Sequence, residues 1–122
     1  MRNVICVGLG GMVGSVCRYL LGLLPIQTGT GFPLKTWLIN LSGAFVIGML
    51  SALVTREPGL RPGWALFWKT GVCGGFTTFS TFALETADLL QQGQGGTAAL
   101  YALSSMILGV GAVMAGQWLL RG

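Results

Sequence analysis

The chain has 122 residues, of which 52% are hydrophobic and only 8% charged, and its formal net charge is +4. A soluble domain carries charge on about a quarter of its residues because its surface faces water, so this composition excludes an ordinary soluble domain and makes lipid the solvent. The seven basic residues are scattered, which argues against a nucleic-acid partner because such proteins need a basic face.

Four apolar stretches have the length of membrane-spanning helices, which need about 20 apolar residues each. The chain is therefore predicted to be a single all-α integral membrane domain over residues 1–122, because four helices joined by short loops satisfy every backbone polar group inside a bilayer. The predicted spans are residues 3–24, 35–54, 63–91 and 97–120.

The first span opens with a glycine-rich run over residues 4–14 that is similar to a dinucleotide-binding loop. The spacing is Gly-x-Gly-x-x-x-Gly, and the first acidic residue of the chain is Glu57, so the carboxylate that would hold a ribose is missing. Gly10 and Gly14 instead place small residues four apart on one helix face, which favours close helix packing in lipid.

Two polar side chains inside the first two spans each allow two interpretations. Arg18 could extend its charge to the membrane interface, or it could draw anions towards a pore. Asn40 could form a hydrogen bond between helices, or its NH₂ group could donate to an ion that has lost its water.

The third span is predicted to break at its centre, over residues 71–78. Gly74-Gly75 and Thr77-Thr78 are poor helix-interior residues. Broken helices expose backbone carbonyls that can hold a cation at mid-membrane.

Hydroxyl and aromatic side chains follow this predicted break. Phe79 and Phe82 share one face, and the positive ring edges could help hydroxyl hydrogens to replace water around a small, hard anion. An ordinary packed core remains an alternative, as does a proton relay through an intramembrane acid. The residues expected to form one polar helical stripe, with Ser80 beside it, are Thr77, Thr81, Glu85 and Asp88.

The basic residues predict the topology only weakly. With four spans, both chain ends lie on the same side as the turn between the second and third spans. A modest bias permits insertion in both orientations. The basic residues assigned to that side are Arg2, Arg56, Arg61 and Arg121, with Lys69 as a further candidate, against Lys35 and Arg18 on the other side.

At these residues the sequence resembles the Fluc family, the CrcB-type fluoride channels of microbes. The resemblance covers essentially the whole chain. It rests on Gly10 to Gly14 with Arg18-Tyr19, on Thr36 to Gly43, and on the highly specific string Gly-x-Cys-Gly-Gly-x-Thr-Thr-Phe-Ser-Thr-Phe that begins at Gly71.

The resemblance implies an antiparallel dual-topology homodimer with two pores at its interface. It implies a structural sodium ion at the dimer centre, held by the backbone carbonyls of Gly74 and Thr77 from both subunits. The residues that it places on the fluoride pathway are Arg18, Asn40, Phe79, Ser80, Thr81, Phe82, Glu85 and Tyr101.

The chain departs from the family pattern at two places. Lys35 stands where the family often has glycine, which could alter the pore mouth. Gly109 and Gly111 stand near expected hydroxyls of the fourth span, where Ser104 and Ser105 could substitute. Some members build the channel from two different subunits, so a heterodimer with a paralogue stays open.

The implied function is passive export of fluoride from the cytoplasm across the cell inner (plasma) membrane, which reduces fluoride toxicity. Two alternatives are a small multidrug-resistance antiporter, which needs a carboxylate in its first span, and a membrane scaffold subunit that transports nothing. An enzyme is not expected, because neither a nucleophile–base pair nor a metal-ligand cluster is visible and the three cysteines have no histidine beside them.

Overall fold

The computed structural model describes residues 1–121, and all its regular elements are helices. Three of them, α1, α2 and α6, are long and apolar enough to cross a membrane. The predicted all-α membrane fold is therefore confirmed at this level. The elements are α1 (Arg2–Gly22), α2 (Leu34–Arg56), α3 (Pro62–Ala65), the π-helix η1 (Leu66–Cys73), α4 (Gly74–Phe76), α5 (Phe79–Gln91) and α6 (Gly95–Arg121).

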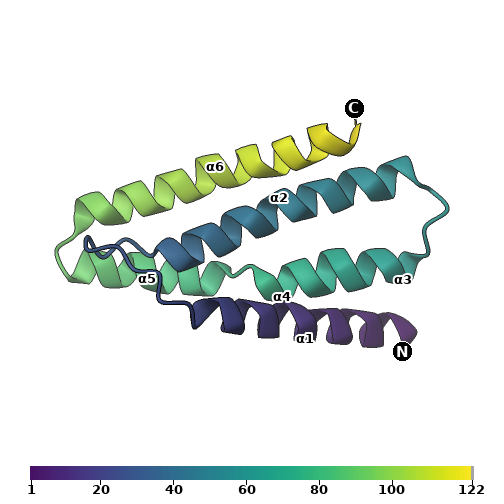
Figure 1. The fold of residues 1–122 in the computed structure, drawn as a ribbon, viewed down its shortest axis with the longest axis horizontal. Coiled ribbons are helices and arrows are strands. Elements are labelled where there is room, and N and C mark those ends of the chain that lie inside the picture. The colour runs from purple at the N-terminus through teal and green to yellow at the C-terminus, as the bar shows by residue number, and fades with distance from the viewer. Residues whose placement is uncertain (122) are drawn as a thin grey trace.

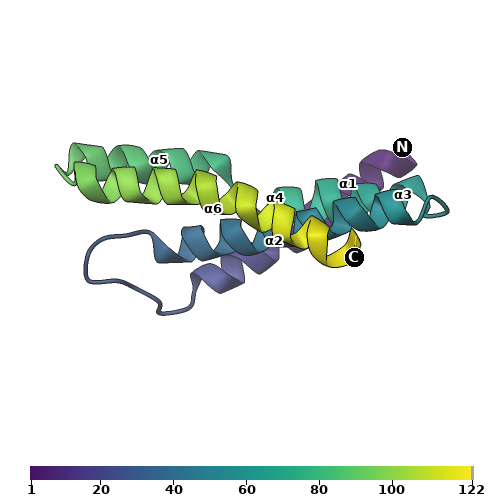
Figure 2. The ribbon, with the colours of Figure 1, turned by 90° about the horizontal axis from the view of Figure 1, so that it is seen from above.

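The helices form a bundle in which α1 packs along η1 and α4, while α2 packs along α6. Both chain ends and the α2–α3 turn lie at the same end of the molecule (Figure 1). Figure 2 shows α5 and α6 side by side at the opposite end, where a tight turn joins them.

The contact between α1 and η1 depends on glycine. A Cβ atom added at Gly10 would lie 2.9 Å from the Gly71 Cα and would also collide with the Phe67 carbonyl; one added at Gly14 would collide with the Val72 carbonyl. The backbones approach so closely that no side chain fits between them, which confirms the packing role predicted for Gly10 and Gly14.

A second close approach, which the sequence analysis did not single out, joins α2 to α6. A Cβ atom at Gly48 would meet the Val113 carbonyl, and one at Gly116 would meet the Phe45 carbonyl. The outward faces remain apolar, with Met106 and Ile107 of α6 65% and 68% exposed. Such faces suit lipid or another helix rather than water.

The third predicted span is the irregular one. Residues 62–76 form one helical run that includes the eight-residue π-helix η1, and the chain resumes as helix α5 at Phe79. The π-helical geometry was not predicted from the sequence. π-Turns inside α-helices are rare and occur frequently at functional sites.

Candidate functional site

The centre of the site is the two-residue gap between α4 and α5. Thr77 (φ −89°, ψ 154°) and Thr78 (φ −147°, ψ 119°) are extended. The Asn40 side chain pairs with the exposed backbone: its Oδ1 accepts the Thr78 N–H at 2.9 Å, and its Nδ2 donates to the Thr78 carbonyl at 3.2 Å. Asn40 therefore joins α2 to the gap, and the second hydrogen of its NH₂ group is left for another acceptor.

Threonine hydroxyls, and not the glycine pair, mark this gap. Gly74 and Gly75 are helical residues of α4, so the part of the predicted break that rested on them is wrong. The Thr77 hydroxyl donates to the Cys73 carbonyl at 2.8 Å, and Thr78 Oγ1 accepts the Thr81 N–H at 3.2 Å as the N-cap of α5. Threonine is a favoured N-cap residue because its hydroxyl satisfies such an orphan N–H.

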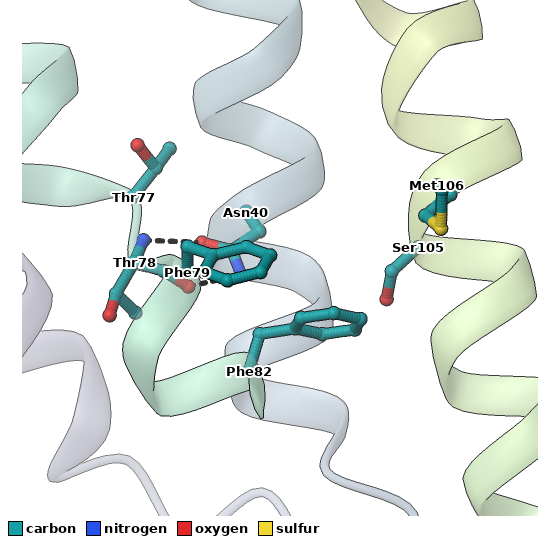
Figure 3. Close-up of a pocket in the computed structure, with 7 residues that line it drawn as sticks. All are labelled: Asn40, Thr77, Thr78, Phe79, Phe82, Ser105 and Met106. Atoms are coloured by element: carbon teal, nitrogen blue, oxygen red, sulfur yellow. Dashed lines mark hydrogen bonds between the residues drawn. The ribbon is translucent and has the colours of Figure 1, made fainter. Parts of the chain in front are cut away.

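A first hollow, which we call the aromatic hollow, opens beside the gap and has a volume of about 290 Å³. Figure 3 shows the Phe79 and Phe82 rings facing α6. The two ring centroids are 5.9 Å apart with the planes at 46°, and Phe79 is 80% exposed. The lining residues are Asn40, Thr77, Thr78, Phe79, Phe82, Ser105 and Met106.

A second hollow of about 360 Å³, which we call the basic hollow, lies on the other side of Thr78. Arg18 and Lys35 line it together with a single carboxylate, Glu85, and with Thr81. Two cations against one carboxylate give it a net positive charge that attracts anions. Thr78 lines both hollows and is the residue that they share.

Both cations of the basic hollow are held by backbone carbonyls. Arg18 Nε donates to the Gly75 carbonyl at 3.2 Å, and Lys35 Nζ donates to the Gly22 carbonyl at 2.9 Å. Arg18 thus links α1 to the last turn of α4, in addition to lining the hollow. Lys35 fixes the end of α1 against the start of α2.

The remaining two predicted pathway residues, Tyr101 and Ser80, differ in burial and in their contacts. Tyr101 is fully buried; its hydroxyl donates to Glu85 Oε1 at 3.0 Å, and its ring lies 5.1 Å from that of Phe82. Ser80 is exposed and contacts Thr78 Oγ1 at 3.5 Å. It lines neither hollow.

The predicted stripe of Thr77, Thr81, Glu85 and Asp88 is wrong for Thr77, which lies before α5, whereas the other three residues keep their helical spacing on α5. Thr77 precedes α5 and lines the aromatic hollow, whereas Thr81 and Glu85 line the basic hollow, and Asp88 is exposed. The stripe assumed one continuous helix across residues 77–88, and the extended gap changes the direction of the chain after Thr77.

Two residues that shape the gap between α4 and α5 were not predicted from the sequence. Thr78 was not proposed as a site residue, although a threonine directly before an amphipathic run is the N-cap signal that could have identified it. Gly43 of α2 leaves room for the gap: a Cβ atom there would collide with the Thr77 methyl group and lie 3.2 Å from the Phe76 ring.

The sequence is similar to that of one known protein family over most of its length. A family model described as "CrcB-like protein, Camphor Resistance (CrcB)" matches residues 5–117. The chain belongs to the CrcB family.

Curated relatives align along almost the whole chain. A protein of Chlorobaculum tepidum is 44% identical, covering 99% of this chain and 96% of its own length. A protein of Rhizobium meliloti is 42% identical (99% and 98%), and one of Agrobacterium fabrum is 43% identical (95% and 94%). Each of the three is named "Fluoride-specific ion channel FluC".

The resemblance to the CrcB-type channels implies sodium at the carbonyls of Gly74 and Thr77, and the local hydrogen bonding fits such a ligand. In a continuous α-helix these carbonyls would accept the N–H groups of Thr78 and Thr81. Here those N–H groups go to Asn40 and to the Thr78 hydroxyl. The freed carbonyls are hard oxygen donors of the kind that bind such cations.

The two serines of α6 that were expected to replace missing hydroxyls of the fourth predicted span have different surroundings. Ser105 lines the aromatic hollow, whereas the Ser104 hydroxyl accepts the Trp37 indole N–H at 3.0 Å. Ser105 therefore supplies the α6 hydroxyl at the hollow, and Ser104 joins α2 to α6.

Proposed function

We propose that this chain is a subunit of a fluoride-selective channel that exports fluoride passively from the cytoplasm and so reduces fluoride toxicity. The observation that carries the proposal is the aromatic hollow, in which two phenylalanine rings lie beside the Asn40 amide at an interrupted helix. Membership of the CrcB family and the names of the relatives support the same function.

A dehydrated fluoride ion needs hydrogen-bond donors and positive ring edges in place of water. The basic hollow, with Arg18 and Lys35, would concentrate the anion at the mouth of the path. The remaining N–H of Asn40 and the edges of Phe79 and Phe82 would then receive it. Selectivity would follow if the assembled path spaces these groups too narrowly for larger anions, which would have no water to bridge them.

Two hydroxyl residues and one acidic residue of α5, Ser80, Thr81 and Glu85, complete the proposed fluoride path. Ser80 and Thr81 lie on the first turn of α5, and Tyr101 donates to Glu85. We assign the two hydroxyls as further donors to fluoride and the Tyr101–Glu85 pair as the polar end of the track. The hydrogen bond from Tyr101 would stabilise the carboxylate charge, and Arg18 and Lys35 in the basic hollow would offset its repulsion of the anion.

The proposed assembly is an antiparallel homodimer of dual topology, with four spans per subunit and the third span broken. The exposure of Phe79 supports it, because an aromatic ring that is 80% exposed in one chain needs a partner to form a closed path. The modest charge bias supports insertion in both orientations. The proposed membrane is the plasma membrane, which in a two-membrane cell is the inner one.

We further propose that sodium at the carbonyls of Gly74 and Thr77 belongs to the centre of this dimer. When bound there, it would supply positive charge that lowers the cost of anions in hydrocarbon. Gly74 is exposed on the single chain, as a shared site between two copies requires.

Two rival functions make different predictions. A multidrug-resistance antiporter needs a carboxylate in its first span, and α1 contains none. A scaffold subunit would leave vesicles tight to fluoride. An enzyme is not supported, because the family is one of ion channels by the names of its members.

The test is fluoride efflux from vesicles that contain the purified chain, read with a fluoride electrode. Phe79→Ile and Phe82→Ile are each expected to abolish efflux, because an aliphatic side chain has no positive ring edge. Leu90→Ala is the matched control: Leu90 is a 60% exposed apolar residue of the same helix that lines neither hollow. Efflux that persists in both phenylalanine variants would remove the aromatic hollow from the path.

A further inference from the structure

The N-terminus and α3 meet at the opposite end of the molecule from α5 (Figure 1). A third hollow is lined by residues of these two segments. We call it the interfacial hollow. Its volume is about 610 Å³, larger than either hollow of the proposed pathway. Its lining includes Arg2, Asn3 and Cys6 from the first two turns of α1, and Arg61 and Trp64 from the start of the third helical run.

The charge of the interfacial hollow is one-sided. Two guanidinium groups, of Arg2 and Arg61, line it, and among residues 1–121 no carboxylate does. Arginine presents paired N–H donors in a planar fork that matches the oxygens of a phosphate group. Asn3 adds an amide NH₂ donor. The chemistry is therefore that of a phosphate-binding site.

The position of the interfacial hollow places that phosphate at the membrane surface. Arg2 is the first residue of α1, and the side chains that follow, Val4 and Ile5, are 66% and 55% exposed and apolar. Tryptophan is enriched at the level of the lipid headgroups, as Trp64 would be here. The hollow thus has cations at headgroup depth beside three less polar lining residues, Cys6, Pro62 and Trp64.

We propose that the interfacial hollow binds the headgroup of an anionic phospholipid, with Arg2 and Arg61 on the phosphate and the upper part of an acyl chain against Cys6, Pro62 and Trp64. These less polar lining residues favour a lipid over free phosphate, which has no apolar group to place against them. Basic pockets between helices at the membrane surface bind anionic headgroups in this way.

The test measures lipid binding to the purified full-length chain in neutral detergent by native mass spectrometry, titrated with phosphatidylglycerol and, separately, with phosphatidylcholine. Arg61→Gln is expected to weaken phosphatidylglycerol binding about fivefold. Arg121→Gln is the matched control, because it removes the same charge at the same end of the molecule from a residue outside the hollow. It should bind as the unchanged chain does.

The Arg61 side chain makes no capping hydrogen bond to α3, so Arg61→Gln removes none, and a thermal unfolding scan of the variant checks that it is folded. Equal binding by Arg61→Gln and Arg121→Gln would overturn the proposal, and so would equal affinity for the two lipids. Displacement of phosphatidylglycerol by millimolar inorganic phosphate would assign the hollow to a free anion instead and would also overturn it. Retention of the lipid in phosphate supports it.

The lipid-binding experiment can fail or succeed independently of the proposed channel function. Arg61 lines neither the aromatic nor the basic hollow, so fluoride efflux by Arg61→Gln in vesicles of pure phosphatidylcholine should equal that of the unchanged chain. Loss of lipid selectivity with normal efflux is the expected pair of results.

Discussion

Replacement of Asn40 by alanine tests how the gap in the third helical run is held. The change removes both hydrogen bonds between the Asn40 side chain and the Thr78 backbone, at 2.9 and 3.2 Å. The Thr78 N–H and carbonyl are then left without these partners in a half-buried position, where water cannot fully replace them.

The magnitude follows from the two lost bonds. Hydrogen bonds between membrane helices contribute about 0.6 kcal/mol on average and about 1.7 kcal/mol at most, so the pair is worth about 1–3 kcal/mol. We expect the free energy of unfolding to fall by that amount. Fluoride efflux should fall by at least about tenfold, because Phe79 follows Thr78 directly and loses its fixed position.

Chemical denaturation in detergent measures the first effect and a fluoride electrode the second. Asn40→Asp tests the need for a neutral amide, because a carboxylate can accept the Thr78 N–H but faces the Thr78 carbonyl, and a charge inside a span costs about 2.5–3.5 kcal/mol. It should be at least as destabilising as Asn40→Ala and should also lose efflux. Unchanged stability and efflux in Asn40→Ala would refute the reasoning, since the gap would then be held by other contacts.

Two further substitutions test the packing around the site. Tyr101→Phe should lower the free energy of unfolding by about 1 kcal/mol, because it removes the 3.0 Å hydrogen bond to Glu85. Tyr19→Phe is the control, since the Tyr19 side chain is 67% exposed. Equal effects of the two changes would contradict a stabilising role for the Tyr101–Glu85 hydrogen bond. Gly10→Ala should destabilise the fold by about 1–3 kcal/mol through overpacking against η1. Gly8→Ala should be neutral or stabilising, because nothing lies within 4 Å of the added Cβ atom. Equal free energies of unfolding for Gly10→Ala and Gly8→Ala would show that α1 and η1 can move apart at no cost.

The elements that the sequence predicted well are those governed by hydropathy. The apolar stretches 3–24, 35–54 and 97–120 correspond to α1, α2 and α6 within a few residues at each end. The packing role of Gly10 and Gly14 was also predictable, because small residues four apart leave a flat helix face. Both signals depend only on local sequence.

The details of the third helical run were not predictable in the same way. The chain carries poor helix formers at Gly74, Gly75, Thr77 and Thr78, and propensity alone does not say which of them leave the helix. The choice depends on Asn40, which is 38 residues away in sequence and offers Thr78 a better partner than the next helical turn. The two-residue extended gap is therefore a tertiary effect.

The same effect explains why the predicted pathway residues divide between two hollows. Periodicity placed Thr77 and Thr81 on one stripe because it assumed a continuous helix, whereas the gap sends Thr77 to the aromatic hollow and Thr81 to the basic hollow. A sequence pattern can identify the donors, but the direction of each side chain depends on where the helix stops.

A single hydrogen bond connects the main features of the site. When the Thr78 N–H turns to Asn40, it leaves the Gly74 carbonyl without its helical donor and starts α5 with the Thr78 hydroxyl as its cap. The proposed cation ligand and the position of Phe79 are thus consequences of the same backbone turn. A substitution at Asn40 should therefore affect ion selectivity, cation dependence and stability together, whereas substitutions at Phe79, which is largely exposed on the single chain, should affect conduction with little change in the stability of that chain.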